Sequence, residues 1–476
     1  MKLSNQFSLV GNSLWRIPLL ASSFFAYGSS AVAGEPSVDP PKQAGSTAKP
    51  NIILILTDQQ TASAMGCAGN ADVKTPAMDA LAKDGRIFER AYCSYPLSGP
   101  CRASLMTGKM PVELGVKDND DPLSDADMAR NIGFVLQSGG YDCLYAGKWH
   151  IPETDIPVGR GFTKICGMDD RILVDACRPY LATDRQKPLF LVASFLNPHE
   201  ICEYARNESL HYGALPDVDP KGCPNLPINF MESTYWPEAL TLHKNTVVKS
   251  YPTGSYSQDD WRRYLYAYYR LVERVDAEMG RLIEVLKSEG LYDNSLIIFT
   301  SDHGDGAATH QWNQKRSLSE TVVNVPFIVK TPKNMGKHPK ETSQALINIG
   351  LDVFPTICDY AGVGLPDGLN GHSLRPLMEG VVDQVAGEVF VETLLDGANV
   401  RGWSIVEQDY KYVFYRFYKN REQLFSLVKD PGEMLNLAVD QREHQNLVRM
   451  REKMYRWAVK TNDLMLQKAL RELVSR

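Results

Sequence analysis

The chain of 476 residues has no surplus of positive charge, because its 51 lysines and arginines face 57 aspartates and glutamates and the net charge is −6. A nucleic-acid binder needs a basic face that neutralises phosphates, so we expect no nucleic-acid partner. No stretch reaches the roughly 18 to 20 apolar residues of a membrane-spanning helix, and we expect no membrane span. With 43% hydrophobic residues the chain can build a large core, which excludes disordered, collagen-like and coiled-coil classes.

Cysteine is present, but not in the pattern of a structural zinc site: nine cysteines occur without paired short spacings. The odd number leaves at least one thiol unpaired within the chain. The pairs closest in sequence are Cys166/Cys177 and Cys202/Cys223, and export would permit a disulfide in either, although spacing does not decide connectivity. No cysteine precedes Cys67, so the N-terminal apolar run is not followed by a lipid-attachment site.

Residues 1–33 have the features of a secretion signal. Positive charges precede a run of 11 mostly apolar residues from Ile17 to Tyr27, and small residues at 31–33 form a cleavage site. An uncleaved apolar anchor is the alternative, but this run is too short to cross a bilayer. Residues 34–50 are rich in proline and predict an extended linker. We therefore expect a protein that is exported to the periplasm or secreted.

Three apolar runs have the length and composition of strands buried on both faces of a parallel sheet. Each run ends in polar residues. The runs are 51–57, 189–196 and 296–300, followed by Asp58-Gln59, Asn197-Pro198-His199 and Ser301-Asp302-His303-Gly304 respectively. A helix with an apolar residue every three or four positions, opened by Ser257 and ended by Gly290, precedes the third run. This alternation predicts an open α/β sheet whose ligand site lies beyond the carboxyl ends of the strands.

The pattern of apolar and aromatic residues in the sequence changes from about Gly397 onward. Short aromatic-rich segments at 403–406, 410–418 and 424–427 predict a small antiparallel sheet, and residues 443–473 predict a terminal helical stretch. We therefore expect an α/β fold with a large mixed, mostly parallel sheet sandwiched by helices. It comprises a large α/β domain over residues 51–385 and a smaller C-terminal subdomain with an antiparallel sheet over residues 386–476.

The most informative segment is Ser98-Gly-Pro-Cys-Arg102-Ala-Ser-Leu-Met-Thr107-Gly108. Composition alone describes a Pro/Gly turn that enters a helix. Position by position, however, it resembles the signature of the type I, formylglycine-dependent sulfatases of the alkaline phosphatase superfamily: Cys or Ser, any residue, Pro, any residue, Arg, and Thr-Gly five residues beyond the Arg. Further segments resemble the family in order, over roughly residues 50–440: Thr57-Asp58, Gly147-Lys148-Trp149-His150, Pro198-His199, Ser301 to Gly304, Lys315, Gln423-Leu424-Phe425 and Asp430 to Glu433.

The resemblance implies that Ser98 is oxidised after synthesis to formylglycine. The hydrated aldehyde is a geminal diol, of which one hydroxyl attacks sulfur to give a covalent sulfo-enzyme and the other loses a proton to expel sulfate. Unmodified serine, with no base beside it in the sequence, is a weak nucleophile. The Ser form of the signature resembles bacterial carbohydrate sulfatases matured by a radical enzyme, which would act here before export.

The resemblance also places a calcium ion among Asp58, Gln59, the group at position 98, Asp302 and His303. Many relatives carry Asp at the position of Gln59 and Asn at that of His303. Glutamine still offers a carbonyl oxygen but removes one negative charge, and histidine offers a nitrogen, which is softer than a hard cation prefers. We expect one divalent cation, with calcium first. Any one of these side chains taken alone would be read as a turn or a helix cap.

Cationic side chains complete an anion site in the resemblance. Lys148 and Lys315 would stabilise the charge that a sulfate ester gathers at the transition state, and Arg102 would orient the diol. His150 resembles the base that collapses the sulfo-enzyme, and His199 the acid at the leaving oxygen. Asn197, Asp305 and His310 receive no role.

Sequence alone says less about the substrate. Residues 200–269 hold 12 aromatic side chains, including Tyr204, Tyr212, Tyr235, Trp236 and Tyr251. Rings of this kind stack on sugars, but they equally serve loop and helix packing, and both readings stay open. A further set of charged residues could reach ring hydroxyls or a uronic carboxylate: Asp169, Asp170, Arg171 and Arg206.

We therefore interpret the sequence as an enzyme that hydrolyses a sulfate ester on a carbohydrate of the glycan or glycosaminoglycan type. One alternative is a phosphonate or phosphodiester hydrolase of the same superfamily, which can share the nucleophile and metal. The other is a non-catalytic protein that binds sulfated glycans and leaves Ser98 unmodified.

Overall fold

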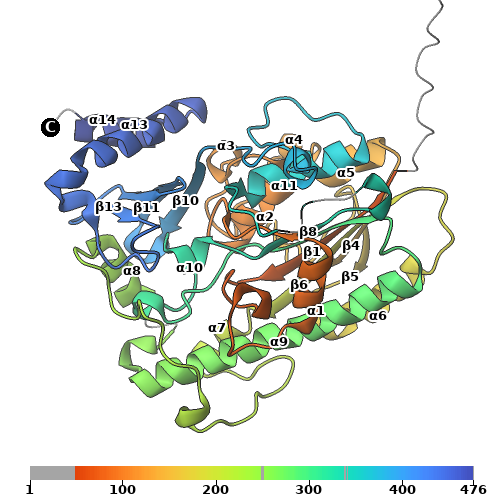
Figure 1. The fold of residues 1–476 in the computed structure, drawn as a ribbon, viewed down its shortest axis with the longest axis horizontal. Coiled ribbons are helices and arrows are strands. Elements are labelled where there is room, and N and C mark those ends of the chain that lie inside the picture. Colours follow the sequence, from red (N-terminus) through yellow and green to blue (C-terminus); the bar gives the residue numbers. More distant parts are fainter. Residues whose placement is uncertain (1–48, 248–250, 337–338, 340, 475–476) are drawn as a thin grey trace, which may run out of the picture. The chain divides into compact units, whose positions relative to one another are not determined.

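The computed structural model describes residues 49–247, 251–336, 339 and 341–474 (Figure 1). The predicted signal segment, residues 1–33, and all but the last two residues of the linker 34–50 lie outside this part. Among the described residues, no helix is both long and apolar enough to cross a membrane. The α/β fold predicted from the sequence is confirmed.

A mixed sheet of seven strands has the order β2-β8-β7-β1-β6-β4-β5. Its strands are β1 (Asn51–Asp58), β2 (Arg86–Ile87), β4 (Asp142–Gly147), β5 (Thr163–Cys166), β6 (Leu189–Pro198), β7 (Ser295–Ser301) and β8 (Phe327–Lys330). The three predicted strands are β1, β6 and β7, which lie side by side and parallel, and β4 is parallel to β6. Within the described residues, β8 alone runs against its neighbours in this sheet.

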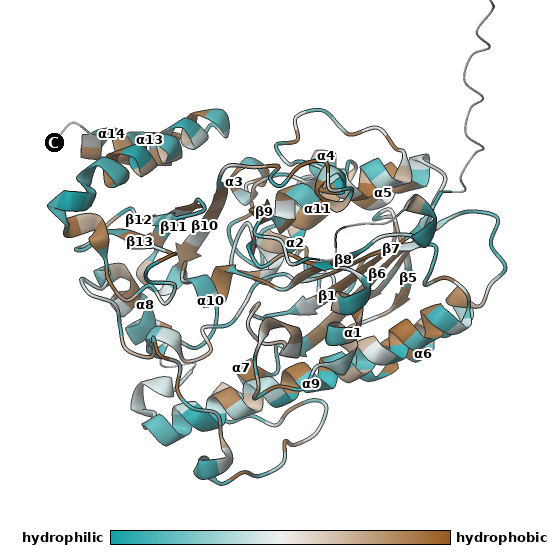
Figure 2. Cartoon of the chain, viewed as in Figure 1, coloured by the Kyte–Doolittle hydropathy of each residue, from teal (hydrophilic) through white to brown (hydrophobic). Residues whose placement is uncertain are grey.

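Helices cover both faces of the sheet (Figure 1). The alternating side chains of β1 explain why this strand is apolar throughout: Ile52, Leu54 and Leu56 enter one hydrophobic core, and Ile53 and Ile55 enter the other. The first core contains α2 (Ser98–Thr107), α5 (Ile132–Ser138) and α11 (Ile349–Ala361), and the second contains α1 (Pro76–Asp84), α6 (Asp170–Leu181) and α9 (Gln258–Ser288). Figure 2 shows the central strands as a hydrophobic layer, with polar residues on the helices around it.

The long helix α9 begins and ends as predicted. The side chain of Ser257 caps it by accepting a hydrogen bond from the backbone N–H of Asp260, and the side chain of Asp260 accepts one from the backbone N–H of Ser257. The helix ends at Ser288, two residues before Gly290, which has a left-handed backbone with φ of 68°.

The predicted C-terminal antiparallel sheet is also confirmed, with the strand order β10-β11-β12-β13. Its strands are β10 (Val389–Leu395), β11 (Val400–Val406), β12 (Tyr410–Tyr415) and β13 (Glu422–Ser426). One face, including Val391 and Val413, shares the core of α2, while the other packs against the C-terminal helices. The predicted boundary at 385/386 falls just before β10 and stays a prediction.

Two boundaries predicted from sequence are wrong in detail. The terminal helical stretch consists of two helices, α13 (His444–Lys460) and α14 (Leu464–Val474), because the chain turns at Asn462, whose φ is 55°. The segment predicted as a strand over 410–418 leaves the sheet after Tyr415.

The remaining strands and α-helices lie between these elements, together with short 3-10 turns. They are β3 (Ala91–Tyr92), which pairs with β9 (Ile347–Asn348), and the helices α3 (Pro111–Leu114), α4 (Asp125–Met128), α7 (Ile201–Ala205), α8 (Glu238–Val247), α10 (Glu320–Val323) and α12 (Arg375–Met378). All nine cysteines lie in the described part and are free thiols, so neither Cys166/Cys177 nor Cys202/Cys223 is a disulfide in the structure.

Gly147, at the end of β4, is a position that only glycine fits. Its φ is 93°, and a Cβ atom there would lie 1.9 Å from the carbonyl oxygen of Ser194 in β6. Gly159 has a similar φ of 80° but open space around it, so it offers a matched control.

We predict that Gly159→Ala costs about 1 to 2 kcal/mol, the usual cost of a left-handed alanine. Gly147→Ala should cost at least about 2 kcal/mol more, because the clash with β6 adds to the same strain. The midpoints of urea unfolding measure the difference. Equal midpoints for the two variants would contradict the close approach of β4 to β6.

Candidate active site

The parallel strands at the centre of the sheet bring four distant segments together. Because β7, β1, β6 and β4 are parallel neighbours, their carboxyl ends meet at one edge of the sheet. Asp58 is the last residue of β1, and Asp302, His199 and Lys148 directly follow β7, β6 and β4. Residues up to 244 positions apart in the chain therefore meet in a single site. The positions of Asp58, His199 and Asp302 after predicted strands indicated this meeting, whereas no strand was predicted before Lys148.

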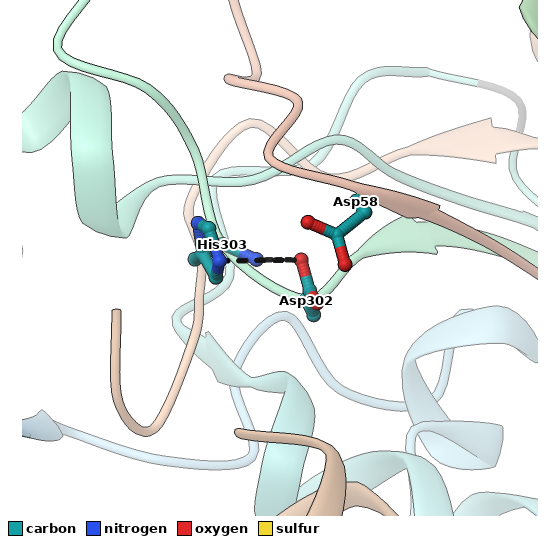
Figure 3. Close-up of side chains that lie close together, drawn as sticks. All are labelled: Asp58, Asp302 and His303. Atoms are coloured by element: carbon teal, nitrogen blue, oxygen red, sulfur yellow. Dashed lines mark hydrogen bonds and ion pairs between the residues drawn. The ribbon is translucent and has the colours of Figure 1, made fainter. Parts of the chain in front are cut away.

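Two buried carboxylates and an imidazole form the floor of this site (Figure 3). One ligand atom from each of Asp58, Asp302 and His303 lies within 4.8 Å of the others. Ser98, the first residue of α2, places its Oγ 3.3 Å from Oδ2 of Asp58 and 3.2 Å from Nε2 of His303. All four side chains are fully buried.

The hydrogen bonds of His303 show which nitrogen could bind a cation. Its Nδ1 lies 2.9 Å from the carbonyl oxygen of Gly304, which can only accept, so Nδ1 carries the hydrogen. The lone pair of Nε2 is then directed toward Ser98 and the carboxylates. A second group that fixes the tautomer in this way is typical of histidine ligands in metal sites.

Arg102 lies one helical turn after Ser98 and joins the two carboxylates. Its Nε donates to Oδ2 of Asp302 at 2.8 Å, and one terminal nitrogen donates to Oδ2 of Asp58 at 3.0 Å. The other terminal nitrogen donates to the Lys148 carbonyl oxygen and to Oγ of Ser194. The structure thus places Arg102 against the carboxylates, and its link to Ser98 runs through Asp58.

Asp58 is surrounded by positive charge. Burial raises the pKa of its carboxyl, but the positive charges around it, with Lys148 first and Arg102 also among them, outweigh burial and hold that pKa well below its usual range. The Nζ of Lys148 lies 2.7 Å from Oδ2 of Asp58. Asp58 is therefore ionised at every physiological pH.

Two histidines and a second lysine lie on the other side of the carboxylates. Nε2 of His199 is 3.2 Å from Nζ of Lys315, and burial together with the charges of Lys315 and Lys148 lowers the pKa of His199. Burial is the main cause that lowers the pKa of His150 to about 3, and the charge of Lys148 is the next cause. Its Nδ1 is buried and has no hydrogen-bond partner among the described residues. Both imidazoles are neutral near pH 7, so each retains a nitrogen lone pair that can take up a proton.

Comparison with known proteins agrees with this geometry. The family model described as Sulfatase matches residues 50–363, which is more than half of the chain. The chain belongs to the sulfatase family. A second model, for the C-terminal region of N-sulphoglucosamine sulphohydrolase, matches residues 308–460. As a family member, the protein is a sulfuric ester hydrolase.

The relatives of this sulfatase include carbohydrate sulfatases. The chain is similar to a Delta 4,5-hexuronate-2-O-sulfatase of Bacteroides thetaiotaomicron, with 29% identity over 424 residues, 82% of this chain and 85% of the relative. An N-acetylglucosamine-6-O-sulfatase of the same organism is 26% identical over 497 residues, 86% and 87% of the two chains. The solved structure of a 2-O GAG sulfatase superposes with a TM-score of 0.77 at 26% identity, over 87% of this chain and 93% of that chain.

A cavity of about 440 Å³ opens above the floor of the site in this sulfatase. Lys148, His150, His199 and Lys315, all singled out from the sequence, lie in its lining. Further lining residues were missed by the sequence analysis, and among them are Asn119, His211, His243, Lys244, Trp312 and Asp396. They come from separate loops and from α8, and no motif marks them, so only the fold gathers them.

The loop that joins β10 and β11 of the C-terminal sheet contributes to this wall. Asp396 follows β10 and lies 3.2 Å from Nδ1 of His243 and 3.3 Å from a terminal nitrogen of Arg316. The ring of His243 in turn stacks on Trp312, with centroids 5.6 Å apart. One side of the cavity is therefore formed by side chains that contact one another and come from the C-terminal sheet region, from α8 and from the segment around Lys315.

Of the five aromatic residues singled out between 200 and 269, Tyr251 lines the cavity. The four charged candidates for sugar contact, all within the described part, do not line it. Asp170 is buried and accepts hydrogen bonds from the backbone N–H groups of Leu196 and Asn197, and Arg206 pairs with Glu203. Asp170 and Arg206 therefore make contacts within the protein.

Gln59 is the predicted ligand that the structure uses differently. Its Oε1 accepts a hydrogen bond from Lys315 at 3.2 Å, and its Nε2 donates to Oδ2 of Asp305 at 2.8 Å. Its role as a ligand of a cation stays a prediction. His310, without a role in the sequence analysis, bonds the carbonyl oxygen of Met231 through Nδ1.

Proposed function

We propose that this sulfatase hydrolyses a sulfate ester on a carbohydrate, using formylglycine at position 98 and one divalent cation. A single observation carries the proposal: Ser98 lies among Asp58, Asp302 and His303, next to a cavity lined by two lysines and two histidines. The carbohydrate follows from the relatives, whose names specify sulfated hexuronate and N-acetylglucosamine.

The donor set fits the cation. Asp58 is held ionised, Asp302 contributes a second carboxylate, and His303 has its Nε2 lone pair directed inward. Calcium is the first candidate because oxygen atoms dominate this set, with Gln59 as a possible further oxygen donor. When bound, the ion supplies positive charge that stabilises a deprotonated hydroxyl at position 98.

Formylglycine, once hydrated, supplies a geminal diol as the nucleophile toward sulfur. Lys148 and Lys315 bind the nonbridging and leaving oxygens of the ester, where negative charge grows in the transition state. The ammonium of Lys315 donates to Nε2 of neutral His199, so the Lys315–His199 pair holds a proton at the leaving oxygen, and neutral His150 accepts one from the group at position 98. Arg102 keeps both carboxylates in place throughout.

We further infer that the enzyme works in the periplasm or outside the cell, after maturation by a radical enzyme. The support is in the sequence: an apolar N-terminal run with a small-residue site at 31–33, and serine at position 98 in place of cysteine.

The first prediction concerns Ser98. Peptide mass spectrometry of protein from its own host should find formylglycine at this position. Ser98→Ala should lower turnover by at least about 10³-fold, as loss of a nucleophile does, with an unchanged thermal midpoint. Ser98→Cys should become a substrate for the aerobic oxidase that accepts only cysteine. An active natural preparation that contains only unmodified serine would refute the mechanism.

The second prediction concerns the cation. Elemental analysis of active enzyme should find one divalent ion per chain, and Asp302→Ala should lose both the ion and activity because a buried carboxylate ligand is gone. Asp352→Asn is the matched control, because Asp352 is a buried carboxylate that bonds backbone N–H groups away from this site. Active enzyme without a divalent ion would rule the metal site out. If zinc is found in place of calcium, the nitrogen ligand of His303 would explain it.

The third prediction separates the two histidines by leaving group. A sugar alkoxide leaves poorly and needs a proton, a contribution of roughly 10²- to 10⁴-fold, whereas a nitrophenol leaves without help. His199→Ala should therefore depress hydrolysis of a sulfated sugar far more than that of 4-nitrophenyl sulfate. His150→Ala should slow both substrates alike. Equal losses of activity on both substrates for His199→Ala would show that the acid is assigned wrongly. Faster hydrolysis of a phosphate ester than of the matched sulfate ester by the wild type would favour the phosphonate hydrolase alternative.

A further inference from the structure

Asp305 is a buried carboxylate for which the reaction as described has no use. It follows His303 by two residues, is fully buried and does not line the cavity. Its Oδ1 accepts hydrogen bonds from the backbone N–H of Ala307 at 2.7 Å and from the hydroxyl of Tyr264 at 2.9 Å. Its Oδ2 accepts from Nε2 of Gln59 at 2.8 Å and from the backbone N–H of Gln314 at 3.1 Å.

The first effect of Asp305 is on the amide of Gln59. A carboxylate only accepts hydrogen bonds, so the NH₂ end of Gln59 is the end that faces Asp305. The carbonyl end then points the other way and accepts from Nζ of Lys315 at 3.2 Å. Asp305 thereby decides which end of the amide meets the lysine.

The second effect is on the backbone that carries Lys315. The residues on either side, Gln314 and Arg316, both have φ of 72°, in the left-handed region that side chains other than glycine rarely occupy. Such a conformation persists only where surrounding contacts enforce it. Asp305 accepts hydrogen bonds from the backbone N–H groups of Ala307 and Gln314. These two residues begin and end the segment 307–314 that leads to Lys315, so one carboxylate holds both ends of that segment.

Tyr264 in turn fixes Asp305. This tyrosine lies in α9, is fully buried, and its hydroxyl is within 3.0 Å of both carboxylate oxygens. Because α9 packs along the sheet, the carboxylate is held by a rigid element.

We propose that Asp305, fixed by Tyr264, is a positioning residue that places the ammonium of Lys315 beside His199 by holding both the Gln59 amide and the Gln314 backbone. The inference rests on the proposed function, in which Lys315 and His199 act at the leaving oxygen. Asp305 neither lines the substrate cavity nor bonds Lys315 itself, so it acts through Gln59 and Gln314, and we expect its effect at the leaving oxygen beside Lys315.

The experiment uses matured, metal-loaded full-length enzyme with a series of aryl sulfates from 4-nitrophenyl to phenyl sulfate, and a sulfated sugar that the wild type hydrolyses. Asp305→Asn keeps the shape but offers an NH₂ group where an acceptor is required. It should lose about 10- to 100-fold in kcat/KM on phenyl sulfate and on the sugar, and less than about 3-fold on 4-nitrophenyl sulfate. In a Lys315→Ala background, Asp305→Asn should lower kcat/KM no further, because both substitutions remove the same interaction between Lys315 and the leaving oxygen.

Tyr264→Phe should give the same leaving-group dependence with a smaller loss, and it carries the test if Asp305→Asn does not fold. Its matched control is Tyr412→Phe, which removes another buried tyrosine–carboxylate hydrogen bond, to Glu422 in the C-terminal sheet, and should leave the dependence unchanged.

Losses that are equal across the series, additive with Lys315→Ala, or accompanied by loss of the metal would overturn the role of Asp305 while leaving the proposed function intact. A wild-type enzyme that hydrolyses no sulfate ester would instead overturn the proposed function, and this inference with it.

Discussion

The ion pairs of Arg102 with Asp58 and Asp302 are the constraint on which the active site depends. All three side chains are buried, and two carboxylates a few ångströms apart repel each other unless a cation lies between them. Removing one partner of such a buried pair typically costs about 3 to 5 kcal/mol, because an uncompensated charge remains. The planar guanidinium bonds both carboxylates and also the Lys148 carbonyl, so one side chain of α2 joins the ends of β1, β7 and β4.

The same charges divide the site into two functional sides. With Asp58 held ionised and the carboxyl group of Asp302 beside it, the floor suits a cation next to Ser98. Lys148 and Lys315 face the cavity and suit an anion, and their charge, added to burial, keeps His199 and His150 neutral. A sulfate ester can therefore be held by lysines while its reacting oxygen atoms meet histidines that exchange protons.

The surrounding structure provides rigidity at this edge of the sheet. Ser98 begins a helix that is buried along its whole length, so the nucleophile position is packed on every side. The cavity wall is tied together by the contacts among Asp396, His243 and Trp312, which link the C-terminal sheet to α8 and to the segment before Lys315. The cavity wall is thus built from segments that lie far apart in the chain.

Much of this was readable in the sequence, because the signals are local. Apolar runs long enough for buried strands predicted β1, β6 and β7, the cap at Ser257 predicted the start of α9, and the residues around Ser98 identified the family. Strand boundaries and the break between α13 and α14 were less accurate, since they depend on single backbone conformations such as that of Asn462.

Other features were decided only by the tertiary structure. The sequence does not reveal that the amide of Gln59 is oriented by Asp305, because the two residues lie 246 positions apart and meet only when β1 pairs with β7. The sequence equally gives no sign that His243, Trp312 and Asp396 line one cavity, because they meet only when α8 and two connecting segments come together in the fold. The sequence determines local properties such as strand hydrophobicity, helix caps and the residues of a motif. Contacts between distant segments form only once the sheet has brought those segments together.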